Sequence, residues 1–273
     1  MLVLDECDRM LDMGFEPQVS SIMKYTKDII TQNVLVSATF PRKLKEVIER
    51  LSFLKSNYVS VKMTQENEDD TFTSGVSSTI TQIVHVCAEH KKPKKLIRFI
   101  EGIFEEEKAQ RNKSSILVFC TKIKTVKFVE DFLSRRNTFS CSALHGQMQQ
   151  SLREKSLNGF KCGKTNIMVA TDVAGRGIDI KGLKYVVNYD FPSSLQVYAH
   201  RIGRTGRAEN VGTAFSFFTR NLAPMAKDLI QLLRNCQQKV DPYLLQLLPE
   251  ENLEESKPEM GEDESLKKRK ATI

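Results

Sequence analysis

Short, largely apolar runs recur along the chain, each followed by a polar or glycine-bearing turn and then by an amphipathic stretch. The clearest runs lie at 1–4, 33–36, 114–120 and 166–170, and they do not alternate between apolar and polar positions. Continuous apolar strands are buried on both faces, which is typical of parallel sheets that lie between two layers of helices. The pattern therefore predicts an α/β fold, a parallel sheet with helices on both faces.

Changes in composition predict the domain boundaries. Residues 62–79 hold four acidic residues among serines and threonines without apolar periodicity, which indicates an exposed linker. Residues 1–61 contain only two strand candidates, too few for a separate parallel sheet, so we interpret them as the end of a first domain. A complete second domain is predicted over 80–248. The acidic stretch from 249 to 273 has the composition of a disordered tail.

The charge is unevenly distributed. The formal net charge is +7, but residues 249–266 hold eight acidic residues and one lysine, which leaves residues 1–248 with 36 basic and 26 acidic residues. A basic folded part suits a phosphate backbone, although surface charge that serves solubility is the ordinary alternative. The basic run at 267–270 is a candidate nuclear import signal, although runs this short also occur by chance.

The loop at 200–207, H-R-I-G-R-T-G-R, places three arginines and two glycines directly after the helix-like stretch 195–199. The planar guanidinium group matches phosphate oxygens in pairs, and glycine allows the backbone to approach a ligand closely. The loop therefore predicts a contact to a polyphosphate or a nucleic acid. A solvated basic turn is the alternative.

Carboxylates follow the first apolar run directly, in D-E-C-D at 5–8. Ligand sites of open α/β sheets lie at the carboxyl ends of the strands. There, one carboxylate can hold Mg²⁺ through its water ligands and a second can orient an attacking water. An acidic turn that caps a helix N-terminus would give the same pattern.

Six blocks of sequence together resemble the DEAD-box ATP-dependent RNA helicases. In order, the blocks are D-E-C-D at 5–8, S-A-T at 37–39, the run 116–122, His145 and Gly146 with Gln150 and Arg153, T-D-V-A-G-R-G-I-D at 171–179, and the arginine loop at 200–207. Any one block is weak, but six in the right order over about 220 residues are specific. The resemblance implies RecA-like domains and an ATP hydrolase that binds and remodels single-stranded or structured RNA.

The resemblance also assigns roles to individual residues. It implies that Asp5 holds Mg²⁺ through water, that Glu6 orients the attacking water, and that Arg204 and Arg207 reach the γ-phosphate of ATP. The other residues implied to contact the nucleotide are Asp179, at the ribose, and His200. The residues implied to couple the nucleotide state to RNA binding are Asp8, Ser37 and Thr39. The implied RNA contacts are Gln150, Arg153, Thr171 and Gly177.

The nucleotide-cradling pattern G-x-x-x-x-G-K-[ST] of the family is missing from the sequence. The one partial match, at 163–165, has Asn158 where the pattern needs glycine and precedes a strand instead of following one, so we expect a surface turn. We therefore interpret the chain as a fragment that is catalytically incomplete alone. A non-catalytic RNA- or protein-binding RecA-like module is the alternative, whereas the intact Glu6, Arg204 and Arg207 favour a helicase.

Two positions depart from the family pattern. Cys7 replaces the alanine of D-E-A-D, and we expect its side chain to face the domain interior; Gly175 stands where alanine is more usual. Neither change removes a charge that the implied chemistry needs.

Other classes of protein fit the sequence poorly. The six cysteines form no C-x-x-C pair and do not cluster with the four histidines, which argues against zinc, and Cys120 and Cys141 lie in apolar strand patterns typical of core residues. No signal peptide or membrane-spanning run is recognisable. We therefore expect an intracellular protein, nuclear or cytoplasmic and not secreted, without a membrane partner.

Overall fold

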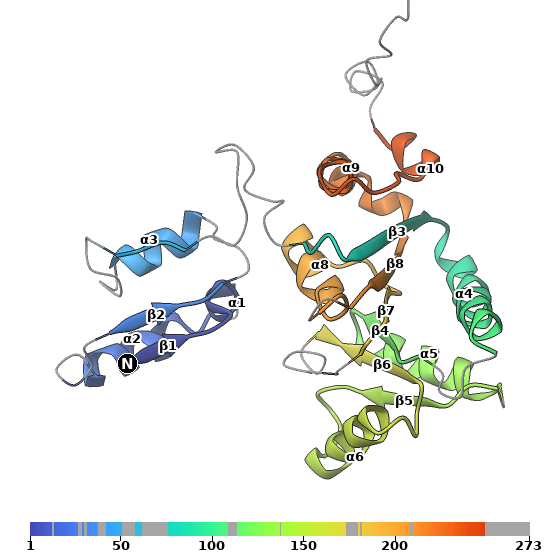
Figure 1. The fold of residues 1–273 in the computed structure, drawn as a ribbon, viewed down its shortest axis with the longest axis horizontal. Helices are drawn as coiled ribbons and strands as arrows, with labels where there is room; N and C mark the ends of the chain where they lie inside the picture. Colours follow the sequence, from blue (N-terminus) through green and yellow to red (C-terminus); the bar gives the residue numbers. More distant parts are fainter. Residues whose placement is uncertain are drawn as a thin grey trace, which may run out of the picture.

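The computed structural model describes residues 1–12, 14–26, 29, 32–37, 42–50, 58–61, 76–108, 114–136, 138–172, 180, 182–207 and 210–248. Two bodies are visible in Figure 1, a small first segment in blue and a larger domain in green to red. The first segment contains β1 (Leu2–Leu4), α1 (Cys7–Asp12), α2 (Glu16–Thr26), β2 (Asn33–Leu35) and α3 (Arg42–Arg50). Strands β1 and β2 pair in parallel, so the strands predicted at 1–4 and 33–36 are confirmed to within a residue at each end.

The larger domain is built on a six-stranded sheet. Its described strands are β3 (Ile80–Val86), β4 (Ile116–Cys120), β5 (Cys141–Leu144), β6 (Ile167–Thr171), β7 (Tyr185–Asn188) and β8 (Gly212–Phe218). They lie in the order β3-β8-β7-β4-β6-β5, and every neighbouring pair is parallel. All carboxyl ends of the strands therefore meet at one edge of the sheet, here called the carboxyl edge, and the amino ends meet at the opposite amino edge.

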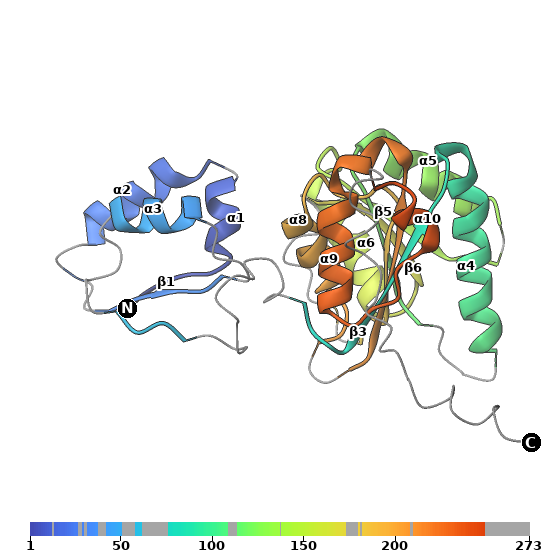
Figure 2. The same ribbon diagram turned by 90° about the horizontal axis from the view of Figure 1, so that it is seen from above.

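Helices cover both faces of this sheet (Figures 1 and 2). The α-helices of the described domain are α4 (Lys92–Glu106), α5 (Ile123–Ser134), α6 (Gln150–Lys161), α8 (Leu195–Ile202), α9 (Ala226–Asn235) and α10 (Pro242–Leu245). The short 3₁₀ turns are η1 (Glu89–Lys91) and η2 (Arg220–Met225). Helices α4 and α5 pack on one face, and α6, α8, α9 and α10 pack on the other.

Strand β4 illustrates why the apolar runs are continuous. Ile116, Val118 and Cys120 point into the core formed with α4 and α5, whereas Leu117 and Phe119 point into the core formed with α6. All five residues are almost inaccessible to solvent. A strand covered on both faces needs apolar side chains at every position, and the predicted α/β fold with a parallel sheet and helices on both faces is confirmed.

The two inner strands β7 and β8 were not predicted. Tyr185–Asn188 (β7) and Gly212–Phe218 (β8) lie inside the sheet, between β4 and the outer strand β3. Both strands contain apolar residues that could have predicted them, but polar residues, among them Asn188 and Ser216, interrupt the apolar runs. Asn188 donates to Ser216 Oγ at 3.0 Å, so these two polar side chains satisfy each other inside the core.

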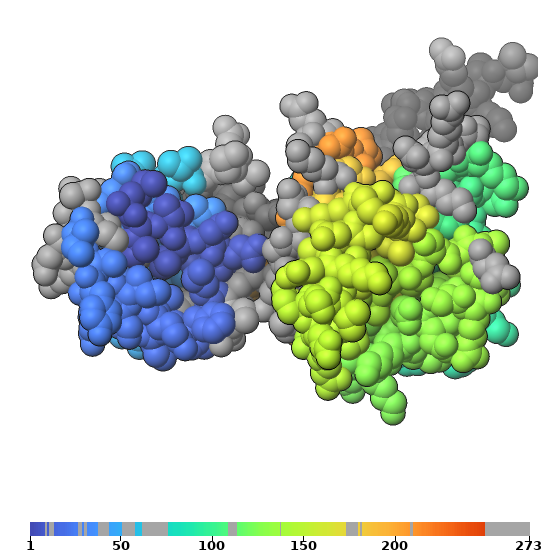
Figure 3. Space-filling model, turned by 90° about the horizontal axis from the view of Figure 1, so that it is seen from below, coloured from blue at the N-terminus to red at the C-terminus, as the bar shows by residue number. Residues whose placement is uncertain are grey.

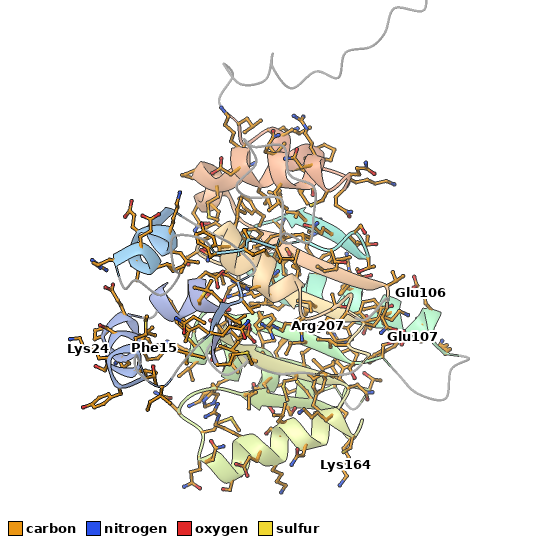
Figure 4. All side chains as sticks on the ribbon, turned by 60° about the vertical axis from the view of Figure 1, so that its left-hand side comes forward. Phe15, Lys24, Glu106, Glu107, Lys164 and Arg207 are labelled. Atoms are coloured by element: carbon orange, nitrogen blue, oxygen red, sulfur yellow. The ribbon has the colours of Figure 1, made fainter. Side chains whose placement is uncertain are left out.

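The partial P-loop match is a surface turn, as expected. Gly163 lies between α6 and β6 with φ 74°, and Lys164 is exposed. Figure 4 shows Lys164 pointing away from the domain.

Cys120 and Cys141 contribute to the core, as the sequence indicated. All six cysteines are free, Cys120 is buried, and Cys141 packs against the core. Within the described residues, no group of three or more His, Cys, Asp or Glu side chains could hold a metal ion. None of the described helices has both the length and the apolar character needed to cross a bilayer.

A buried carboxylate joins three segments at the amino edge. Glu107 is 3% exposed and accepts hydrogen bonds from Ser114 N at 2.9 Å, Ser114 Oγ at 2.6 Å and Lys184 Nζ at 3.1 Å. Burial alone would raise the pKa of Glu107, but the hydrogen bonds from Ser114 and Lys184 outweigh it and hold that pKa below the ordinary 4.5. Glu107 thus fixes the end of α4 to the starts of β4 and β7.

We expect Glu107→Gln to lower the free energy of unfolding at pH 7 by about 2 kcal/mol, since hydrogen bonds to charged groups are lost. Because the pKa of Glu107 is lowered on folding, its ionised form stabilises the protein above the unfolded-state pKa, and this contribution disappears as the pH falls through the folded-state pKa. Thermal unfolding followed by circular dichroism should therefore show the two melting temperatures converging on acidification below pH 4.5. The exposed Glu105, changed to Gln, is the matched control; a constant gap between wild type and Glu107→Gln at all pH values would contradict the assignment.

Candidate functional site

Helix α8 presents the arginine loop. Ser194 caps the helix, because its side chain accepts a hydrogen bond from Val197 N at 3.2 Å, and Gly203 ends it. Apolar side chains of α8, among them Tyr198 and Ile202, are fully buried against the sheet. The opposite side of the helix is thereby left for polar side chains that face the first segment.

Arg201 anchors the loop within the domain. Its Nε and Nη2 donate to the two carboxylate oxygens of Asp172 at 2.6 and 2.7 Å. Its Nη1 donates to Asn188 Oδ1 at 3.1 Å and to the Asp190 carbonyl oxygen at 2.7 Å. The guanidinium also lies 5.3 Å from the centroid of the Phe119 ring. Arg201 is 2% exposed, so this arginine serves as a buried tie between α8 and the carboxyl ends of β6 and β7.

Hydrogen bonds also fix the turn that follows α8. Thr205 Oγ1 donates to the carbonyl oxygens of Leu183 and Lys184, at 2.6 and 3.0 Å. The carbonyl oxygen of Gly206 accepts from Thr79 Oγ1 at 2.8 Å. Gly206 has φ 67°, and a Cβ added there would overlap the side chains of Ile80 and Thr79. Only glycine fits this position, both for its conformation and for its close approach to β3.

We expect Gly206→Ala to destabilise the protein by about 2–5 kcal/mol, the sum of left-handed backbone strain and overpacking. Gly163→Ala is the control, because Gly163 has φ 74° but no atom lies within 4 Å of its added Cβ. It should cost only about 1–2 kcal/mol. Urea denaturation measures both values, and equal losses would rule out the close approach of Gly206 to Ile80.

The acidic turn begins where β1 ends. Asp5 Oδ1 accepts a hydrogen bond from Glu6 N at 2.9 Å, and Glu6 has φ 50°, an uncommon conformation for a residue with a side chain. Cys7 N donates to the Val36 carbonyl oxygen at 3.3 Å, so the turn is fixed to the end of β2. This arrangement leaves Asp5 exposed and Glu6 partly exposed at the carboxyl ends of both strands.

Cys7 faces the interior, as expected from the sequence. It is 3% exposed and packs with Leu44 and Ile48 of α3. Burial raises the pKa of the Cys7 thiol to about 11, although a hydrogen bond with Ser37 lowers it. The thiol therefore stays neutral at physiological pH and acts as a small core side chain.

The acidic turn and α8 meet across the two bodies. Arg204 Nη2 donates to Glu6 Oε1 at 3.2 Å. Asp8 Oδ2 accepts from Gln196 Nε2 at 3.2 Å and lies 3.3 Å from His200 Nε2. The side chains of Asp8, His200 and Arg204 are at most 7% exposed, whereas that of Glu6 is 40% exposed. The hydrogen bond between Arg204 and Glu6 joins a guanidinium to a carboxylate and is therefore charge-assisted, and the Glu6 side chain stays partly exposed to solvent.

Other predicted site residues lie apart from this meeting point. Arg207 is exposed, and its Nε donates to the Gly203 carbonyl oxygen at 2.8 Å (Figure 4). Ser37 is half-buried beside Cys7. Three predicted site residues lie outside the described part of the chain: Thr39, Gly177 and Asp179.

Residues predicted to contact RNA gather at the carboxyl edge around β5 and β6. Gln150 and Arg153 begin α6, whose exposed surface is yellow-green in Figure 3, and Arg153 Nη1 donates to Gln150 Oε1 at 3.3 Å. Thr171 ends β6, directly before the Asp172 that binds Arg201. Burial, and in part the nearby Lys127, lower the pKa of His145 at the end of β5, so this imidazole is neutral at pH 7.

Sequence reasoning missed several residues that build the site. Gln196 was not predicted, although it stands four positions before His200, and on a helix this spacing puts both on one side. Arg201 was counted among the three arginines of the loop without being assigned a role. Arg201 is held by Asn188, which ends β7, and by Asp172 and Asp190, which follow β6 and β7 at the carboxyl edge; this position was the available signal.

Comparison with protein families gives two matches on this chain. The DEAD/DEAH box helicase model matches residues 1–47, and the helicase conserved C-terminal domain model matches residues 91–209. Together they include the acidic turn and the arginine loop.

Curated relatives agree with these matches. The chain is 40% identical over 245 residues to ATP-dependent RNA helicase p62 of Drosophila melanogaster, covering 89% of this chain and 32% of that protein. It is also 40% identical over 249 residues to the probable ATP-dependent RNA helicase DDX17 of Homo sapiens, covering 90% of this chain and 32% of that protein. The chain thus spans about a third of the length of these relatives.

Solved structures share the fold. Dbp5 of S. cerevisiae bound to RNA and ADP BeF3 superposes with a TM-score of 0.65 at 27% identity, over 86% of this chain and 56% of that one. Mss116p bound to ssRNA and AMP-PNP gives a TM-score of 0.70 at 22% identity, over 91% of this chain and 51% of that one, and supports the fold alone. The RecA-like fold expected from the sequence is confirmed.

Proposed function

Because the chain belongs to the DEAD-box helicase family, we propose that it forms part of an ATP-dependent RNA helicase whose ATP site closes between the acidic turn and α8. The observation that carries the proposal is the hydrogen bond between Arg204 and Glu6, residues that lie 198 positions apart. It places a cation from one body beside the carboxylate that in this family would orient a water.

The carboxylates have the chemistry that Mg²⁺ and ATP require. Asp5 and Glu6 offer hard oxygen donors at the carboxyl end of β1, and Asp5 is exposed. A bound Mg²⁺ would neutralise charge that develops on the phosphates. In this proposal Asp5 holds the ion through water, Glu6 orients the attacking water, and Asp8 keeps α8 in place through Gln196 and His200.

The arginines would stabilise the transferred phosphoryl group. Arg204 is nearly buried, so its charge acts in a poorly hydrated environment, while Arg207 is exposed and can swing toward a ligand. The remaining nucleotide contacts, Asp179 and His200, are proposed on resemblance, as are the coupling roles of Ser37 and Thr39. The printed sequence contains no G-x-x-x-x-G-K-[ST] pattern, so tests of ATP turnover need a version of the protein that carries this loop.

RNA would bind at the carboxyl edge through Gln150, Arg153, Thr171 and Gly177. The Arg201–Asp172 pair supports this placement, because it joins the residue next to Thr171 directly to α8, the helix that bears His200 and leads into Arg204. A change in the position of α8 on nucleotide binding would therefore be transmitted to the RNA site. Contacts of this kind are to the phosphate backbone and carry no sequence preference.

We expect the 273-residue chain to bind single-stranded RNA with little sequence preference and strong salt dependence. Each phosphate contact contributes a slope of about −0.7 to log K plotted against log salt. Fluorescence anisotropy with two RNAs of equal length and different sequence, at several salt concentrations, measures both properties. Arg153→Ala should lower the magnitude of the slope by about 0.7. Affinity that is indifferent to salt would contradict the proposed RNA site.

A further inference from the structure

One side of helix α4 carries a row of basic side chains, here called the α4 basic stripe. It consists of Lys91, which caps the helix, and Lys94, Lys95 and Arg98. Positions separated by three and four residues lie on the same side of a helix. Lys91, Lys94 and Arg98 are exposed and Lys95 is half-buried, while the opposite side of α4 is buried in the core.

These charges do not stabilise the helix that bears them. They occupy its first two turns, where the helix dipole is positive and cations are unfavourable. The first turn of α4 has no acidic residue, and its N-cap makes no side-chain hydrogen bond. Among the residues that the structure describes, Lys91, Lys94 and Arg98 form no ion pair, whereas the neighbouring Lys92 pairs with Glu89 at 2.9 Å. Lys95 Nζ lies 2.6 Å from His85 Nε2, so the row without ion pairs consists of the three exposed cations; in this position such a row points to an anionic ligand.

The stripe starts at the edge of the sheet where the candidate site lies. Buried Lys92 Nζ lies 3.6 Å from Asp190 Oδ1, and Asp190 Oδ2 accepts a hydrogen bond from Thr121 N at 3.0 Å. The first turn of α4 is thereby fixed beside the carboxyl ends of β7 and β4. Figure 1 shows α4 continuing from this end along the outside of the domain. An RNA strand bound at the carboxyl edge could cross this edge, from the face covered by α6 to the face covered by α4, and so reach the stripe.

We propose that the α4 basic stripe is a second binding site for RNA phosphates, which takes up the part of a longer strand that leaves the site at β5 and β6. This inference rests on the proposed RNA binding and extends it. A linear row of cations matches the regular spacing of phosphates along a strand, and the stripe shares an edge with Gln150, Arg153 and Thr171. An acidic peptide is the competing ligand.

The test compares two double variants of the 273-residue chain that lose equal charge. Lys91→Gln with Lys94→Gln removes half of the stripe. Lys161→Gln with Lys164→Gln is the control, because these exposed lysines lie at the other end of α6, toward the amino edge. Each protein is titrated by anisotropy with an RNA of about 6 nucleotides, which occupies one site, and with one of about 20 nucleotides, which reaches both.

For the stripe variant we expect unchanged binding of the short RNA and a salt slope smaller in magnitude by about 1.4 for the long RNA, two phosphate contacts being lost. The control variant should match wild type with both RNAs. The stripe variant should also melt about 1–4 °C higher than wild type, since unfavourable charges leave the helix N-terminus. A higher melting temperature with weaker binding excludes misfolding as the cause.

Other outcomes are also decisive. If the long RNA binds the stripe variant with the wild-type slope while the short RNA binds normally, the stripe is no RNA site and the proposed function still stands. If neither RNA binds wild type, the proposed function fails and the inference fails with it. Polyglutamate that binds wild type but not the stripe variant, with RNA binding unaltered, would identify the stripe as a site for acidic peptides instead.

Discussion

Replacement of Arg204 by alanine is expected to lower RNA-stimulated ATP hydrolysis about 10³-fold or more, in a version of the protein that carries a phosphate-binding loop ahead of Met1. Arg204 reaches Glu6 from the other body, and its side chain is only 7% exposed, so its charge is poorly screened by water. The loss of one charge in such a place removes stabilisation of the transition state.

RNA affinity separates this effect from a general loss of structure. Because Arg204 belongs to the proposed ATP site and not to the proposed RNA contacts, the affinity of the variant for RNA should stay within about twofold of wild type. Arg207→Ala should also reduce turnover if its exposed guanidinium swings to the γ-phosphate. Turnover by Arg204→Ala within about twofold of wild type would remove the arginine from the mechanism.

Replacement of Arg201 by alanine should instead destabilise the fold, by about 3–5 kcal/mol, because it leaves the buried partners of a charge network without their cation. The variant loses both hydrogen bonds to Asp172 and those to Asn188 and the Asp190 carbonyl. For a domain of this size the melting temperature should fall by about 10 °C. Differential scanning calorimetry measures this shift.

Two further variants test the explanation. Arg136→Ala breaks a surface pair with Glu101, whose side chains are 49% and 47% exposed, and should cost less than about 1 kcal/mol. Arg201→Lys keeps the charge but cannot form the two parallel bonds to Asp172, so it should resemble Arg201→Ala. A lysine variant as stable as wild type would show that charge alone, and not the planar fork, holds the network.

The fold was largely predictable because its signals are local. Continuous apolar runs predicted β1, β2, β4 and β6, and β3 begins at Ile80, the residue at which the second domain was expected to start. Strands β7 and β8 were not predicted because the polar side chains of Asn188 and Ser216 interrupt the apolar runs. The hydrogen bond between these two side chains exists only in the folded sheet. No spacing in the sequence predicts that two residues 28 positions apart lie side by side on neighbouring strands.

The site was predictable by residue type and not by partner. The carboxylates at 5–8 and the arginine loop stood out by their charges, yet the contacts Glu6–Arg204 and Asp8–His200 depend on how two bodies meet. Gln196 has no charge and belongs to no motif, so only its position on α8 reveals it. For Arg201 the residue type was misleading. Its charge suggested a contact to a ligand, but its guanidinium group donates to Asp172 and to the Asp190 carbonyl oxygen within the protein.

The order of strands in the sheet has a consequence for biosynthesis. The first strand of the domain, β3, pairs along its whole length with the last, β8. Ile80 therefore cannot pair until Gly212, 132 positions later, has been synthesised. At translation rates of about 5–20 residues per second, this delay is on the order of ten seconds. During that time β3 and the central strands are made but the sheet cannot close, and their apolar surfaces are open to chaperones or to other nascent chains. The domain should therefore complete its fold only once β8 has left the ribosome.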